Sequence, residues 1–303
     1  MDVDILVSSI YQGLLWSIMA IGVYLTFRIL DIADMTAEGS FPLGAAITAQ
    51  SLVSGISPIL ATLYGFLGGA AAGLVSGVLH TKLKIPALLT GILTMTGLYS
   101  VNLFVMGKAN ISLLNNIKTI FTMHDFGSST MDVMVIGAVM VVIVIAILVF
   151  FFNTEMGLAA RAVGNNQQMS AANGINNDNM KIIVYMISNG LIALSGSLMM
   201  QMNGYADVSM GIGTIVIALA AIIIAEIILH NLSFGKRLMT IIVGSIIYRL
   251  IIAFVLDRGV DPNALRLFYS LMLAVFLAIP LINKTMKRQK ERRQNNRAMQ
   301  EDE

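Results

Sequence analysis

The sequence predicts an all-α fold, a polytopic bundle of transmembrane helices, and two features predict it. Of the 303 residues 57% are hydrophobic and only 12% are charged, about half the charged share of an ordinary soluble protein. Apolar runs of membrane-spanning length also recur along the whole chain. There is no cysteine and the three histidines show no ligand spacing, so we expect no metal site.

About nine spans are expected, and they make residues 1–283 one transmembrane domain. The second apolar run is short for a crossing, which needs roughly 20 residues, so we expect a broken helix there or one joined to the polar segment before it. The N-terminus lacks the basic region of a cleaved signal peptide, so the first span should remain in the mature protein. The expected spans are 8–30, 41–54, 58–80, 87–106, 131–152, 182–202, 212–230, 237–256 and 264–282.

Basic residues lie on alternate connections between these spans. The link after the third span, the 153–181 loop, the link between the seventh and eighth spans and the 284–303 tail carry most of them. The positive-inside rule then places the 153–181 loop and the tail in the cytoplasm and the N-terminus outside. The basic tail fits a juxtamembrane anchor, with a lipid- or nucleic-acid-binding segment as the alternative; we expect no nucleic-acid partner.

Two segments of the chain resemble one another. Residues 31–46 read DIADMTAEGSFPLGAA and residues 205–220 read YADVSMGIGTIVIALA, each with Ala-Asp, a small-residue turn containing glycine and a following apolar span. Five spans separate the paired elements, and an odd number turns the second copy over in the membrane. Such inverted repeats occur in many transporters, which handle substrate where the two halves meet.

The polar turns inside this repeat are candidates for a solute pathway. Non-helical backbone at membrane depth is tolerated only inside protein or beside a water-filled cavity. The alternative is a pair of interfacial loops, in which Arg28 would pair with Asp31 one helical turn away. The residues assigned to the pathway from the turns are Asp34, Glu38, Gly39, Ser40, Phe41, Asp207 and Gly211.

Arg249 is the other pathway candidate, because it lies well inside the eighth span. A charge at that depth is costly unless it faces a cavity or finds a partner. Asp207 is the candidate partner, and the alternative is that the long side chain extends outward to the membrane surface. Small residues at four-residue spacing in 65–73 indicate close helix packing and would also fit a subunit contact.

The polar 153–181 loop is patterned like a folded segment. Ala159, Ala160, Ala162 and Val163 would form an apolar strip on a short helix that ends at Asn165 and Asn166. Residues 167–173 predict a second short helix, with Gly174 placed to end it. A structured amphipathic loop between membrane spans indicates a docking surface.

Enzyme motifs are missing from the chain. No Walker A sequence, H-E-x-x-H, G-x-S-x-G or EF-hand pattern occurs. We therefore expect no catalytic residues and a transport subunit rather than an enzyme.

The loop sequence GLAARAVGNNQQMSAANGI (157–175) resembles the coupling segment of the branched-chain amino acid and ribose permease family of ABC importers. That family's pattern is a glycine, R-A-x-G-x-N, an alanine and G-I. The turn DMTAEGSF (34–41), followed by Gly44 and Ala45, is similar to the family's D-[LF]-[ST]-x-G-x-F…G-A segment, with one extra residue before Gly39. The loop residues that the resemblance assigns to coupling are Gly157, Ala159, Arg161, Ala162, Gly164, Asn165, Asn166, Ala171, Gly174 and Ile175.

The resemblance also implies partners and a cellular place. A permease of this family sits in the bacterial cell membrane as a homodimer or with a paralogue. It docks on an ATPase subunit that uses the ATP, so no cofactor is bound by this chain, and an extracytoplasmic binding protein delivers the solute. An amino acid is the first expectation for that solute. The alternatives are a sugar or nucleoside, or a stand-alone secondary transporter.

Overall fold

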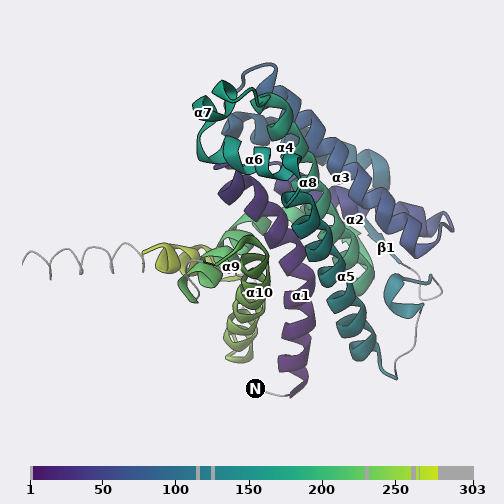
Figure 1. Ribbon diagram of the computed structural model, residues 1–303. Coiled ribbons are helices and arrows are strands. Elements are labelled where there is room, and N and C mark those ends of the chain that lie inside the picture. Colours follow the sequence, from purple (N-terminus) through teal and green to yellow (C-terminus); the bar gives the residue numbers. More distant parts are fainter. Residues whose placement is uncertain are drawn as a thin grey trace, which may run out of the picture.

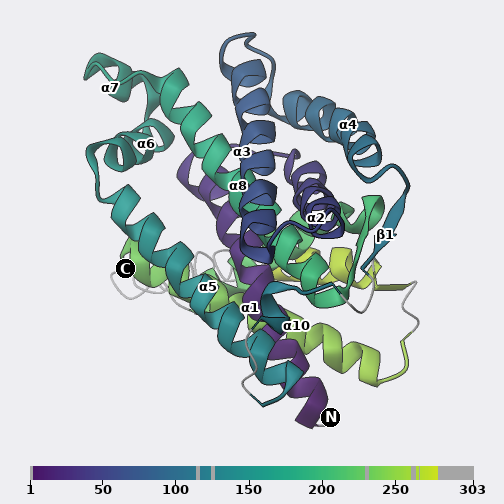
Figure 2. The same cartoon turned by 90° about the vertical axis from the view of Figure 1, so that its right-hand side faces the viewer.

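The computed structural model describes residues 3–113, 117–123, 127–228, 232–260, 264–265 and 267–278. The basic tail and the end of the ninth expected span lie outside them. The chain forms a bundle of long helices with two short helices at one end (Figures 1 and 2). The helices are α1 (Val3–Tyr24), the π-helical turn η1 (Leu25–Ile29), α2 (Ala37–Val53), α3 (Pro58–Thr81), α4 (Ala87–Met106), the 3-10 turn η2 (Ile120–Thr122), α5 (Ser129–Phe152), α6 (Glu155–Asn165), α7 (Gln167–Ala172), α8 (Asn177–Asn203), the 3-10 turn η3 (Val208–Gly211), α9 (Thr214–Ile228) and α10 (Phe234–Asp257); the strands are β1 (Asn110–Ser112) and β2 (Tyr205–Asp207).

Seven described helices are long and apolar enough to cross a membrane, so the expectation of about nine spans is too high. Two of the expected spans form helices that are shorter than these seven: α2, with 17 residues, and the apolar helix Leu267–Ala278. The helix α2 is short because the segment before it, 30–36, is not helical and Asp31 adopts a left-handed conformation (φ 56°). The expected break beside the second apolar run is confirmed.

Helix α8 is the centre of the bundle. In its most apolar stretch 78% of the residues are buried, against 28% in α4. Helices α2 and α3 approach it closely through glycine, because a Cβ on Gly44 would lie 2.0 Å from the Ala193 carbonyl oxygen and one on Gly73 would lie 2.2 Å from that of Tyr185. The small residues at four-residue spacing in 65–73 therefore pack closely against α8 within this chain.

The two ends of the bundle differ. At one end α6 and α7 follow α5 and precede α8, beside the end of α1 (Figure 1). At the other end β1 and β2 pair antiparallel, with Asn110 opposite Asp207, and join the ends of α4 and α8. We call the end with α6 and α7 the loop end and the end with β1 and β2 the strand end.

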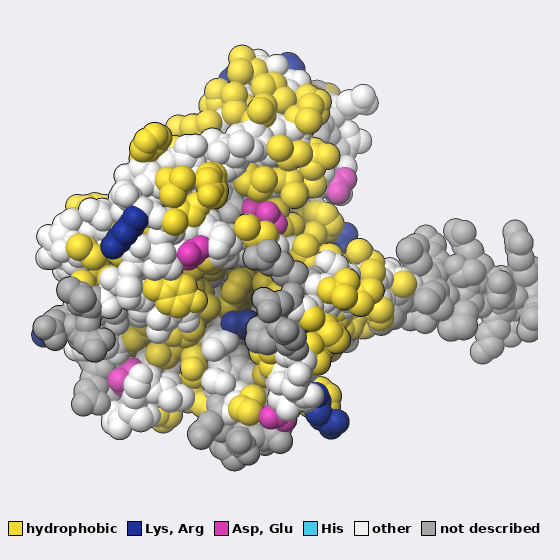
Figure 3. Space-filling model, turned by 180° about the vertical axis from the view of Figure 1, so that it is seen from behind, with side chains coloured by type: hydrophobic (Ala, Val, Ile, Leu, Met, Phe, Trp, Pro, Cys, Tyr) yellow, Lys and Arg dark blue, Asp and Glu magenta, His cyan; other side chains and the backbone are white. Residues whose placement is uncertain are grey.

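Much of the outer surface is apolar. Figure 3 shows one face on which hydrophobic side chains form large patches and charged ones are scattered. Phe104 on α4, Phe150 on α5 and Leu67 on α3 are among the exposed residues. A surface of this kind suits contact with lipid.

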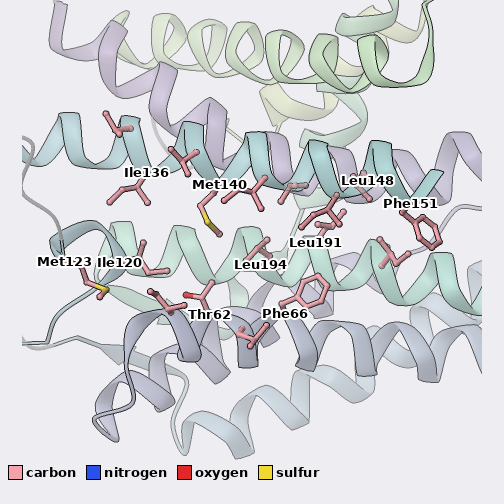
Figure 4. Close-up of a pocket in the computed structure, with 18 residues that line it drawn as sticks. Thr62, Phe66, Ile120, Met123, Ile136, Met140, Leu148, Phe151, Leu191 and Leu194 are labelled. Atoms are coloured by element: carbon pink, nitrogen blue, oxygen red, sulfur yellow. The ribbon is translucent and has the colours of Figure 1, made fainter. Parts of the chain in front are cut away.

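A cavity of about 740 Å³ lies between α3, α5 and α8. Side chains such as Phe66, Met140 and Leu194 point into it from these three helices (Figure 4). Thr62 is the polar side chain of the lining, and its hydroxyl donates to the Pro58 carbonyl and accepts from Gln201 Nε2. The cavity therefore offers no free polar group to a polar solute.

Candidate coupling loop and solute pathway

The 153–181 loop folds into two helices by local capping. Thr154 caps α6, and its Oγ1 accepts a hydrogen bond from Gly157 N at 3.4 Å. Asn166 ends α6 and caps α7, and its Oδ1 accepts from Met169 N at 3.0 Å. Gly174 then turns the chain with φ 79°. The expected pair of helices and the break between them are confirmed, although α7 ends one residue earlier than predicted.

The glycines of the loop motif face the bundle. A Cβ on Gly164 would lie 1.6 Å from the Ile29 carbonyl oxygen, and one on Gly157 would lie 2.3 Å from the Phe151 carbonyl oxygen. Any side chain at these positions would collide with backbone. The two glycines therefore hold α6 against η1, which continues α1, and against the end of α5.

Arg161 also points inward. Its guanidinium carbon lies 4.3 Å from the centroid of the Phe234 ring and 5.6 Å from that of Phe152. A guanidinium over an aromatic face is held by a cation–π attraction. Arg161 thus joins α6 to α5 and α10, while Ala160 and Val163, on the predicted apolar strip, are buried.

The outward face of the loop carries large apolar side chains that sequence reasoning passed over. Met169 is 66% exposed, Leu158 54% and Met156 47%. The available signal was their place in a polar loop, outside the predicted apolar strip. The other loop residues assigned to coupling divide into exposed Asn165, Asn166, Ala171 and Gly174 and half-buried Ala159, Ala162 and Ile175.

Asp34 is buried in a hydrogen-bonded network. Its Oδ1 accepts from Thr36 N at 2.9 Å and its Oδ2 accepts from Asn189 Nδ2 at 2.8 Å. The Oδ1 atom of the same Asn189 accepts from the Ser40 hydroxyl at 2.7 Å. Asn189 on α8 therefore joins the turn before α2 to α2 itself. Sequence reasoning missed Asn189, although an asparagine inside a span was the available signal.

The two resembling segments meet inside the bundle. Glu38 Oε1 accepts from Gly213 N at 3.0 Å. A Cβ on Gly211 would lie 1.9 Å from the Glu38 carbonyl oxygen, which Pro42 leaves without its intrahelical N–H donor. The first turn of α2 thus contacts the segment just before α9, through the Glu38 side chain at Gly213 and through a close main-chain approach at Gly211. Gly39 and Phe41 are buried nearby, with Phe41 stacked on Trp16.

Asp207 lies at the strand end. Its carboxylate accepts from Ser209 N at 2.7 Å, from the Ser209 hydroxyl and from Asn110 Nδ2 at 3.2 Å. The Ser209 hydroxyl holds the pKa of Asp207 below its ordinary value. Because this carboxylate is engaged as the cap of η3, the expected pair with Arg249 is wrong.

Two arginines have partners that sequence reasoning did not identify. Arg28 pairs with Glu226 on α9 and not with Asp31, which is exposed in a left-handed turn beyond the end of η1. Arg249 Nη2 donates to Gln12 Oε1 on α1 at 2.6 Å. Both partners are distant in sequence, so helical spacing cannot reveal them.

Comparison with known proteins identifies the family. A family model described as "Branched-chain amino acid transport system / permease component" matches residues 5–280. The chain belongs to this family. It is 44% identical over 283 residues to the "Tyrosine transport system permease protein" of Clostridioides difficile (strain R20291), covering 93% of this chain and 94% of that one.

Two more distant relatives are named for ribose import. The chain is 27% identical to the "Ribose import permease protein RbsC" of Bacillus subtilis (strain 168), covering 86% of this chain and 79% of the relative. The protein of the same name in Escherichia coli (strain K12) is 25% identical, with 88% and 82% covered. No solved structure matches the chain.

The chain is therefore the membrane-spanning permease of an ABC importer. It is a multi-pass membrane protein and a transport component. Membership of the family implies an ATPase and a solute-binding protein as partners.

Proposed function

We propose that this permease imports an amino acid and is driven through the outward face of α6 and α7 by an ATPase that binds and hydrolyses the ATP. The loop end is then cytoplasmic and the N-terminus extracytoplasmic, in agreement with the positive-inside rule. Two copies of the chain form the pathway. The preference for an amino acid rests on the higher identity to the tyrosine permease than to the ribose permeases.

The observation that supports coupling is the construction of the loop. Its inward face is fixed to α1, α5 and α10 by Gly157, Gly164 and Arg161. Its outward face presents Met156, Leu158 and Met169 to the exterior of the bundle. Apolar side chains on a rigid base can transmit a push when two states of a partner contact them differently.

The test replaces Met169 by glutamate and measures copurification of the ATPase subunit and ATP-driven uptake in proteoliposomes. We expect Met169→Glu to lose both, because a charge would be buried against the partner without a counter-charge. Met131→Glu makes the same change at an exposed methionine at the start of α5, toward the strand end, and should keep both. Normal copurification and uptake by Met169→Glu would overturn the coupling surface.

The solute is tested in the same proteoliposomes, supplied with the cognate binding protein. Labelled L-tyrosine should accumulate in the proteoliposomes when ATP is present in their lumen, and it should remain outside when ATP is absent. Accumulation of labelled D-ribose in place of tyrosine would refute the amino acid assignment while leaving the coupling surface intact.

A further inference from the structure

Arg249 has a position that requires an explanation. It lies within the apolar helix α10, between Tyr248 and Leu250, in the half nearer the strand end. A guanidinium at membrane depth is costly without a partner, because it cannot be deprotonated under ordinary conditions. Arg28, which lies at the end of another spanning segment, has Glu226 as its counter-charge.

No described carboxylate fills that role for Arg249. The ion pairs among the described residues join Arg28 to Glu226 and both Lys82 and Lys84 to Asp178. Arg249 has Gln12 as a hydrogen-bond acceptor at Nη2 and the Trp16 ring at 5.1 Å, while its buried Nε has no hydrogen-bond partner. The titratable groups around it are Tyr11 and Tyr269 from neighbouring helices and Tyr248 on α10 itself, and Asp257 of α10 lines the same cavity.

The guanidinium borders a cavity of about 380 Å³ between α1 and α10. This volume lies within the roughly 300–1,000 Å³ of small-molecule sites. One wall is polar, with Ser8, Ser9 and Gln12 from α1, and Arg249 faces the cavity from α10. Ile252 and Leu256 supply an apolar wall, and Asp257 adds a carboxylate to the lining, so the cavity suits a small zwitterion with an apolar part.

We propose that Arg249 binds the carboxylate of the transported amino acid in this cavity between α1 and α10. A guanidinium presents a planar fork of N–H donors that matches a carboxylate, and Nε is a free donor of that fork. Gln12 holds the guanidinium through Nη2, and Trp16 supports it on one side. The carboxylate supplies a counter-charge to Arg249, which forms no ion pair with any described carboxylate. This site rests on the proposed import of an amino acid.

The chain contains a built-in reporter for this site, because Trp16 is its one tryptophan. A carboxylate that pulls on Arg249 changes the contact between the guanidinium and the indole ring and hence the fluorescence of Trp16. The purified full chain in lipid nanodiscs is titrated with L-tyrosine, L-tyrosinamide and sodium acetate, with sodium chloride as the matched salt. Excitation is set where tyrosine absorbs weakly.

Wild-type protein should respond saturably to L-tyrosine and, at higher concentration, to acetate. L-tyrosinamide keeps the ring and the amino group but has no carboxylate, so it should give no saturable response. Arg249→Gln should weaken the L-tyrosine response at least about tenfold, and Arg249→Lys should weaken it less, because an ammonium keeps the charge and loses the fork. Monodispersity and ATPase copurification show that each variant is folded.

Equal responses of the wild-type protein to L-tyrosine and L-tyrosinamide would overturn the proposal, as would no response to L-tyrosine and acetate. Unchanged tyrosine binding by a folded Arg249→Gln protein would show that Arg249 only joins α1 to α10. A response to acetate together with no uptake of amino acids would retain the carboxylate site and refute the proposed solute. Because the titration needs no ATPase, its outcome is separate from that of the coupling test.

Discussion

The loop between α5 and α8 and the turn before α2 are both polar, yet they use polar residues in opposite ways. In the loop, amides such as Asn165 and Asn166 face outward, and glycine and apolar side chains hold the segment to the bundle. Around the turn, Asp34, Ser40 and Asn189 face one another in the interior. The difference teaches that exposed polar residues of a membrane protein form a surface for a partner, whereas buried polar residues bond one helix to another.

The largest expected effect comes from replacing an asparagine by leucine in each of the two regions. Asn189→Leu leaves the Asp34 carboxylate and the Ser40 hydroxyl without their shared partner, so we expect a loss of about 3 kcal/mol or more in the free energy of unfolding. Asn165→Leu on the exposed end of α6 should change it by less than about 0.5 kcal/mol. Thermal unfolding of the two variants in detergent measures both, and similar midpoints would contradict the buried network.

The second prediction concerns the inward face of the loop. Gly164→Ala places a methyl group against the Ile29 carbonyl oxygen and should displace α6, at about 1–3 kcal/mol. ATP-driven uptake should fall strongly while membrane insertion persists. Gly97→Ala on α4, where an added Cβ would meet nothing within 4 Å, is the matched control and should leave uptake unchanged. Full uptake by Gly164→Ala would mean that the position of α6 does not matter for transport.

A smaller effect is expected from the cation–π contact. Arg161→Gln should weaken the attachment of α6 by about 0.5–2 kcal/mol, because Phe152 and Phe234 lose their cation. Arg161→Lys should retain part of it. Hydrogen exchange of the α6 amides measures the local opening. Equal protection in wild type and Arg161→Gln would show that the glycines alone hold the helix.

The smallest effect concerns Asp207 at the strand end. Its pKa is lowered in the folded protein, so its contribution to stability is present above the ordinary carboxyl pKa and is lost as pH falls through the lowered value. Asp207→Asn should therefore reduce the decline in melting temperature on the acidic side and leave uptake near neutral pH unchanged. An uptake defect at neutral pH would instead place Asp207 in transport.

The sequence predicts the loop better than the interior for a physical reason. Thr154, Asn166 and Gly174 act on backbone within a few residues, so their pattern alone predicts two helices and the break between them. The partners of Asp34 and Arg249 are Asn189 and Gln12, which folding brings from distant helices. The predicted strip of apolar residues did not reveal that Met169 is exposed, because exposure depends on which face of the loop meets α1, α5 and α10.

The backbone contacts of Gly44 and Gly73 with α8 have a mechanical consequence. Helices that touch main chain to main chain cannot slide past one another without opening a gap or a clash. We therefore expect α2, α3 and α8 to move as one rigid body during the transport cycle. The hinges that carry alternating access then belong to helices with lighter packing at the periphery, such as α4 and α5.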